Sequence, residues 1–296
     1  MTPPGVRFTF VGGTGRCGSS LVQELLACHP DVGFVSNVDD HAPRRSLGTA
    51  NNAVYRRVPP AWRRKGRLRF APSEGWRSLA REVSPLVCEP GRDLLAADLT
   101  PWLAERFRAY FEDRAAAQGR PAFVHKFTGW PRYGFVDAAL PGSRFVHLVR
   151  DGRSVVNSWL QMPWWRGHRG PEGWHFGPLP PAYADEWEAS GRSYVVLAGL
   201  AWKLLLDAFD DAAAKLAPER RLVVRFEDLL AEPTATLDRL CGFAGLASSA
   251  PFERAVARSR LGPGRGEAWR RELSPEQVAL LDRSLAGHLA RHGYAV

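Results

Sequence analysis

Short runs of apolar residues alternate along the chain with longer segments of helical periodicity. The run "VRFTFVGG" (6–13) is apolar, ends in two glycines, and has the pattern of a buried strand. In the next segment, 19–28, apolar residues recur three and four positions apart, which is the spacing of a helix packed on a sheet. The opening of the chain therefore predicts a strand, a glycine-rich loop and a helix in direct succession.

The rest of the chain repeats this alternation. Residues 37–75 show little periodicity and predict loops and short helices, 162–185 predict a long structured loop, and Pro131 is expected to open a helix. The other predicted strands cover 122–127, 143–151 and the first part of 220–230, which then runs into a turn. The other predicted helices cover 98–118, 152–161, 190–216, 232–244 and 273–293.

Two of these helices carry clear start signals. Asp98 or Thr100 is a suitable N-cap for the helix at 98–118, with Pro101 in its first turn. Ser274 and Gln277 have the spacing of a capping box at the start of the last helix. Alternating strands and helices predict an α/β fold: a parallel sheet with helices on both faces, formed by a single domain over 1–296.

The composition narrows the class of protein. The 296 residues are 45% hydrophobic and 24% charged, as in globular proteins, and contain no run of 18 apolar residues that would predict a membrane span. The N-terminus lacks the features of a signal peptide, so we expect a cytoplasmic protein. The four cysteines form no C-x-x-C pair, which indicates reduced thiols and predicts no metal site.

The formal net charge of +9 suggests an anionic partner, but only four of the 40 cationic residues are lysine and the arginines are spread along the chain. A non-catalytic nucleic-acid binder is one interpretation of this charge. No basic–aromatic motif of a nucleic-acid module accompanies it, so we expect no nucleic-acid partner. Nothing in the sequence determines the oligomeric state.

The loop "GGTGRCGSS" (12–20) resembles a Walker A phosphate loop without its lysine. Ser19 occupies the lysine position, and Arg16 stands three residues earlier. Backbone N–H groups of such a loop and the following helix N-terminus form an anion site. Loss of the lysine argues against a triphosphate with its metal, so a P-loop small-molecule kinase is the second choice. The expected phosphate-binding residues are Gly13, Thr14, Gly15, Arg16, Cys17, Gly18, Ser19 and Ser20.

This loop resembles the 5′-phosphosulfate loop of sulfotransferases, whose usual pattern is G-x-x-[RK]-S-G-T-T. Cys17 replaces the serine of that pattern, and Ser19 and Ser20 replace its two threonines. The resemblance implies the co-substrate 3′-phosphoadenosine 5′-phosphosulfate (PAPS), the product 3′-phosphoadenosine 5′-phosphate (PAP), no metal, and a small-molecule or glycan acceptor. It extends from about 6 to 285 and is weakest at 37–120 and 162–200, where such enzymes bind their acceptors.

A second phosphate site is expected after the strand at 143–151. Arg150 ends this strand and Ser158 lies on the next helix, so the two side chains can converge on one phosphate. Their spacing matches the sulfotransferase 3′-phosphate motif, R-[DN]-x-x-x-x-x-x-S. An alternative is a Walker B strand ending at Asp151, or a purely structural Arg–Asp pair.

Two C-terminal segments also resemble sulfotransferases. The segment 222–246 is similar to a part of the family that is mostly structural. The segment "RLGPGRGEAWRRELSP" (260–275) resembles the late Gly- and Arg-rich loop that closes over the nucleotide, which makes Arg260, Arg265 and Trp269 candidate nucleotide-binding residues.

Sulfuryl transfer needs cations at the departing phosphate and a base for the acceptor proton. Arg16 is a candidate for the leaving phosphate, and Lys126 resembles the family lysine beside the sulfate. Thr128 stands where many cytosolic relatives have a histidine base. Other branches use a carboxylate shortly after the first helix, and the candidates here are Asp39 and Asp40, then His41, with His125 last.

The acceptor is expected to meet an aromatic region. A lid over an apolar, aromatic or sugar acceptor is one interpretation of this region, and ordinary core packing is the other. The residues concerned are Trp159, Trp164, Trp165, Trp174, Phe176, Tyr183 and Trp187.

Overall fold

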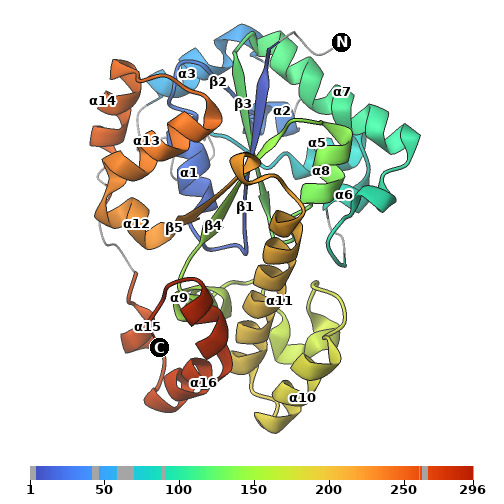
Figure 1. Cartoon of the computed structure of the whole chain (residues 1–296), viewed down its shortest axis with the longest axis vertical. Coiled ribbons are helices and arrows are strands. Elements are labelled where there is room, and N and C mark those ends of the chain that lie inside the picture. The colour runs from blue at the N-terminus through green and yellow to red at the C-terminus, as the bar shows by residue number, and fades with distance from the viewer. Residues whose placement is uncertain are drawn as a thin grey trace.

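A five-stranded, all-parallel sheet forms the centre of the fold, in the strand order β2-β3-β1-β4-β5 (Figure 1). The computed structural model describes residues 5–41, 47–58, 70–88, 91–259, 261 and 266–295. The strands are β1 (Arg7–Gly13), β2 (Val32–Gly33), β3 (Ala122–Thr128), β4 (Arg144–Val149) and β5 (Arg221–Arg225). The expected α/β class with a parallel sheet is confirmed.

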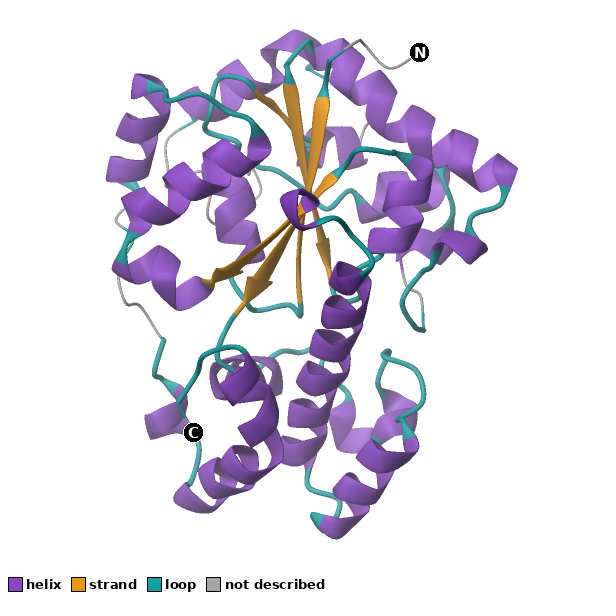
Figure 2. Ribbon diagram, viewed as in Figure 1, coloured by secondary structure: helices purple, strands orange, loops and turns teal. Residues whose placement is uncertain are grey.

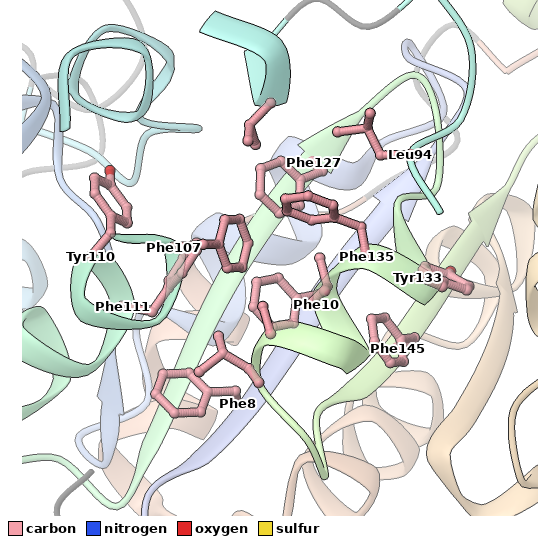
Figure 3. Packing of buried hydrophobic residues seen from close by; sticks show 14 of the residues in the cluster. Phe8, Phe10, Leu94, Phe107, Tyr110, Phe111, Phe127, Tyr133, Phe135 and Phe145 are labelled. Carbon is pink, nitrogen blue, oxygen red and sulfur yellow. The ribbon is translucent and has the colours of Figure 1, made fainter. Parts of the chain in front are cut away.

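Helices cover both faces of the sheet because its strands are apolar on both sides (Figure 2). On one face Phe8 and Phe10 of β1 pack with aromatic residues of α7 (Pro101–Gln118) and α8 (Tyr133–Ala139), as Figure 3 shows. On the other face Val11 packs with α1 (Ser19–Leu26) and α13 (Pro233–Ala244). Successive side chains of a strand therefore enter different cores, and this alternation decides which way each site residue points.

A third apolar cluster lies below the sheet in Figure 1, where α9 (Gly152–Leu160), α11 (Tyr194–Ala214) and α16 (Pro275–Arg291) pack together. The remaining helices are α2 (Asn37–His41), α3 (Asn51–Arg57), α5 (Trp76–Glu82), α6 (Pro85–Cys88), α10 (Pro181–Ala189), α12 (Phe226–Ala231), α14 (Ala250–Arg258) and α15 (Trp269–Glu272).

The predicted helix starts are confirmed where a cap was recognised. Thr100, and not Asp98, caps α7 by accepting a hydrogen bond from the backbone N–H of Leu103. Ser274 and Gln277 form the expected capping box of α16.

The observed elements differ from the prediction at several places. The helices α5 and α6 lie between the predicted segments, and α8 begins at Tyr133 and not at Pro131. The short strand β2 was missed because two residues are too few to show a period. The strand predicted to run into a turn at 220–230 is β5, and in place of the turn it is followed by α12, whose first turn carries two acidic residues that suit a helix N-terminus. The helix α10 begins inside the loop predicted at 162–185, and α14 was not predicted.

Two general expectations can be compared with the described chain. All four cysteines are free thiols, in line with the absence of a paired motif. Over the residues that the structure describes, no helix has both the length and the apolar character needed to cross a bilayer.

Candidate active site

The predicted phosphate loop, Lys126 and Arg150 meet at one edge of the sheet. The strands β1, β3 and β4 run parallel, so their carboxyl ends lie side by side. Gly13, the last residue of β1, is in register with Thr128 of β3, and its carbonyl oxygen accepts a hydrogen bond of 3.0 Å from the N–H of Gly129. This edge of the sheet therefore brings together the loop, Lys126 and Arg150, which are far apart in the sequence.

The loop between β1 and α1 is held in a tight, left-handed conformation. Gly15 and Gly18 have φ values of 85° and 94°, and Arg16, between them, has a φ of 56°. A Cβ atom on Gly13 would lie 2.3 Å from the Sγ of Cys17, and one on Gly18 would lie 2.2 Å from the ring of Phe226. The loop leads into the N-terminus of α1, whose first N–H groups have no partners within the helix and can bind an anion.

Gly18→Ala is expected to destabilise the protein more than Gly142→Ala. Both glycines have a positive φ, but a Cβ on Gly142 would have nothing within 4 Å, so this control reports the backbone strain alone. The contact with Phe226 should add about 2 kcal/mol to the loss in the free energy of unfolding, measured by urea denaturation. Equal losses in the two variants would show that the loop can accept a side chain at this position.

Residues of the two predicted phosphate sites, the loop and the Arg150–Ser158 site, contact each other. The Nε of Arg16 donates a hydrogen bond of 2.8 Å to the Oγ of Ser158 on α9, and Nη1 of Arg150 donates one of 2.9 Å to the carbonyl oxygen of Arg16. Arg150 lies over the ring of Phe226, and burial lowers its pKa, although the group remains a cation at neutral pH. The Nε of Arg150 is buried without a hydrogen-bond partner among the described residues.

The C-terminal candidates divide into two groups. Arg260 and Arg265 lie outside the described residues. Trp269 is buried, and the guanidinium carbons of Arg153 and Arg270 each lie 4.4 Å from a ring centre of Trp269. Trp269 therefore packs the start of α15 against α9, and Ser154 holds the same segment by donating a hydrogen bond to the carbonyl oxygen of Gly266.

Lys126 reaches the phosphate loop because of its place in β3. Val124 and Ala122, two and four residues earlier, pack on the α1 side of the sheet. Side chains alternate along a strand, so the lysine side chain also points toward α1. Its Nζ donates a hydrogen bond of 2.9 Å to the Oγ of Ser20 and one of 3.3 Å to the Oγ1 of Thr128. It also forms an ion pair with the carboxylate of Glu74, and both side chains are mostly buried.

Glu74 is the site residue that the sequence analysis missed. Its Oε1 contacts the Nζ of Lys126 and accepts a hydrogen bond from the hydroxyl of Thr128. It lies in a segment without periodicity, 54 residues before Thr128. No local pattern could have paired these residues, since tertiary contacts bring the segment to the end of β3.

Asp39 and Asp40, the favoured candidates for the base, accept hydrogen bonds that connect α2 with neighbouring segments of the chain. Asp39 is 2% exposed, and its Oδ2 accepts hydrogen bonds from the backbone N–H and the hydroxyl of Ser36. Asp40 accepts hydrogen bonds from Ser73 and from the N–H and hydroxyl of Ser78, which flank Glu74. Neither aspartate is among the residues lining the adjacent cavity, whereas Glu74 lines it.

The two histidine candidates point in different directions. His41 is exposed at the end of α2 and lines the cavity beside Glu74. His125 precedes Lys126 in β3 and so points to the opposite face, where it packs against Phe10, Phe111 and Phe127. Burial, aided by the charges of Lys126 and Arg114, lowers the pKa of His125 to about 3. This histidine is therefore neutral and remote from the cavity.

Replacing His125 should flatten the pH dependence of stability. The unfolded chain binds a proton at this histidine below a pKa of about 6.5 and the folded protein does not, so stability is lost as the pH falls from 6.5 toward 3. Between pH 7 and pH 5 the loss is about 2 kcal/mol for this one group. We expect the loss measured by urea denaturation to be smaller by that amount in His125→Leu, and an unchanged loss would contradict the neutral, buried state.

A cavity of about 350 Å³ opens beside Lys126 and Glu74. One face of α1 contributes Ser20, Gln23 and Glu24 to its wall, and α2 contributes Asn37 and His41. Residues 71–74 complete the described lining together with Lys126. The cavity thus lies directly next to the phosphate loop, on the side away from Arg150 in the strand order.

The aromatic residues predicted as a lid are largely part of the core. Trp159, Trp165, Trp174 and Phe176 are buried, and Trp159 stacks on both Trp165 and Phe176. They belong to the third apolar cluster together with residues of α11 and α16. Of the lid candidates, Trp164 is exposed, at 43% of its surface. The core interpretation therefore holds for four of these residues.

A parallel sheet whose first strand leads through a glycine-rich loop into a helix defines a phosphate-loop α/β fold. The sequence model of the sulfotransferase family matches residues 9–250, and the chain belongs to this family. Comparison with the curated proteins gives no significant match.

Solved structures agree with this fold. The chain resembles the sulfotransferase domain of the curacin biosynthetic pathway at 15% identity, with a TM-score of 0.52 over 100% of both chains. It resembles the sulfotransferase STF9 of Mycobacterium avium at 16% identity and a TM-score of 0.59, covering 99% of this chain and 79% of that one. It resembles the sulfotransferase STF1 of Mycobacterium tuberculosis at 17% identity and a TM-score of 0.54, covering 95% of this chain and 76% of that one. At these identities the likeness concerns the fold.

Proposed function

We propose that the protein transfers a sulfuryl group from PAPS to a hydroxyl or amine of a small acceptor. One observation carries this proposal: Lys126, Glu74 and Ser20 meet on one side of the phosphate loop, and Arg150 and Ser158 both contact Arg16 on its other side. These two sets of residues fit a donor that has two phosphate groups and a transferable group. The transferable group would lie between the loop and the acceptor. The free thiols fit a reducing compartment, so we also propose a cytoplasmic location.

The donor would be bound by two groups of residues. The N–H groups of the loop and of the α1 N-terminus, with Arg16, would hold the 5′-phosphosulfate. Arg150 and Ser158 would hold the 3′-phosphate, and the buried Nε of Arg150, which lacks a partner among the described residues, supports this assignment. An arginine can donate two parallel hydrogen bonds to one phosphate.

In the transfer, an acceptor oxygen or nitrogen attacks sulfur while the bond from sulfur to the 5′-phosphate oxygen breaks, and PAP leaves. The acceptor proton goes to the carboxylate of Glu74, which acts as the general base. The ammonium of Lys126 and the guanidinium of Arg16 offset the charge that develops on the sulfuryl and leaving phosphate oxygens. No step requires a metal ion.

The test is the melting temperature in the presence of PAP, AMP or ATP–Mg²⁺. A ligand that binds the native state raises the melting temperature by mass action. We expect a rise with PAP that exceeds the rise with AMP, because only PAP has the 3′-phosphate. A rise with ATP–Mg²⁺ alone would overturn the proposal in favour of a P-loop kinase, and salt-sensitive binding of a DNA duplex without any nucleotide effect would favour a nucleic-acid binder.

A further inference from the structure

We propose that the cavity beside Lys126 binds a compact polyhydroxylated acceptor, such as a single sugar or cyclitol ring, and that Gln23 selects for it. This inference rests on the proposed function, since it treats the cavity as the acceptor site of the sulfuryl transfer.

The position of the cavity makes it the place for the acceptor. Lys126, Glu74 and Ser20 form the end next to the phosphate loop, where the acceptor hydroxyl must meet the sulfuryl group and the base. From there the cavity runs along α1 toward α2, away from Arg150. The donor and the acceptor would therefore enter from different sides of the loop.

The wall of the cavity is polar. Of its ten described lining residues, eight have side chains that donate or accept hydrogen bonds, and the two others are Ala71 and Pro72. An apolar ring would cover this polar wall without forming hydrogen bonds to it, and a buried donor such as the Gln23 amide that is left unpaired costs about tenfold in affinity. Several hydroxyls around a ring can satisfy such groups at once.

Gln23 gives this wall a specific donor. It is 2% exposed, it lines the cavity, and its side-chain Nε2 has no hydrogen-bond partner among the described residues. Ser20 lies three residues earlier on α1, so both side chains occupy one face of the helix. The reacting hydroxyl group of the acceptor would lie beside Ser20 and Lys126. A neighbouring hydroxyl group of the same ring would accept a hydrogen bond from the Gln23 amide.

The size of the cavity limits the acceptor further. Its volume of about 350 Å³ is near the lower end for sites that bind small molecules. Four of the aromatic side chains that would suit a flat apolar acceptor are buried in the third apolar cluster instead, and none of the seven is among the described residues that line the cavity. Both features favour one hydrophilic ring over an extended apolar molecule.

The test compares myo-inositol and methyl glucoside with cyclohexanol as acceptors for PAPS. These probes share a six-membered ring and a secondary hydroxyl, and differ mainly in the number of hydroxyl groups. We expect the wild-type kcat/KM to be at least about 100-fold higher for the polyols. Gln23→Met, which keeps the length of the side chain and removes the amide, should reduce this ratio at least about tenfold.

A matched control is Thr9→Val on β1. Thr9 is also buried with an unpaired side-chain oxygen, but it does not line the cavity, so its removal should leave the ratio unchanged. Binding of the same probes to the PAP complex is followed by saturation-transfer NMR. A preference for cyclohexanol, an unchanged ratio in Gln23→Met, or no polyol transfer and no polyol signal would each overturn the inference.

Failure of the proposed function has a different signature. In that case the wild-type protein would show neither stabilisation by PAP nor release of PAP from PAPS with any acceptor. Stabilisation by PAP without any polyol signal would leave the donor site intact and reject only the acceptor class.

Discussion

Glu74→Gln should lower kcat for sulfuryl transfer by about 100-fold or more while the affinity for PAP stays unchanged. The glutamine keeps the size of the side chain and its contact with Thr128, but it cannot accept the acceptor proton. PAP has no transferable group and reacts with no acceptor, so its binding does not depend on a base. The measurement is steady-state transfer from PAPS to the best acceptor, together with calorimetric titration of PAP.

The control for this variant is Glu82→Gln. Glu82 lies on the neighbouring helix α5, where it pairs with Arg81 and Arg114, and it does not line the cavity. It should retain kcat. A Glu74→Gln variant with a normal kcat would remove Glu74 as the base, and a parallel loss of PAP affinity would instead indicate damage to the loop.

Arg150→Ala should weaken PAP binding by about 10- to 100-fold and leave AMP binding nearly unchanged. A hydrogen-bonded charged pair contributes about 1.5–3 kcal/mol, and only PAP has the 3′-phosphate that Arg150 is proposed to hold. Titration of both nucleotides into wild type and variant separates this effect from a general loss of structure. Arg150→Lys should also bind PAP less tightly, because an ammonium cannot make two parallel hydrogen bonds.

Arg221→Ala is the charge-matched control for this experiment. Arg221 is exposed at the first position of β5, at the opposite end of the strand from the phosphate loop. Its removal changes the net charge by the same amount. Equal losses of PAP affinity in the two variants would mean that long-range attraction, and not a 3′-phosphate site, binds the nucleotide.

The arrangement of strand, loop and helix around Arg16 could be predicted from sequence because it is local. The loop, the strand before it and the helix after it are contiguous, so their order along the chain already describes their arrangement. Arg150 and Ser158 are likewise joined by one strand end and one helix. Parallel strands then bring both segments to one edge, as the α/β pattern predicts.

The carboxylate that lies beside Lys126 could not be predicted in the same way. Asp39 and Asp40 had the right residue type at a plausible distance along the chain, but their carboxylates accept backbone and serine hydrogen bonds within the structure. The carboxylate beside Lys126 comes from a segment without periodicity. Its place depends on the contacts of that segment with α2, which no local pattern reports.

The position of the aromatic region also could not be predicted from the sequence. Tryptophan in a glycine- and proline-rich stretch is compatible with a lid and with a core, and composition does not distinguish them. Only the packing of Trp159 on Trp165 and Phe176 decides for the core.

The sequence by itself determined the α/β class, the order of strand, glycine-rich loop and helix around Arg16, and the strand-to-helix connection that carries Arg150 and Ser158, because each depends on residues close together in the chain. The tertiary structure alone decided which carboxylate meets Lys126, that His125 faces away from the cavity, and that the cavity wall is polar. These depend on contacts between distant segments and on which face of a strand or helix is covered. Such contacts follow from the packing of the whole fold.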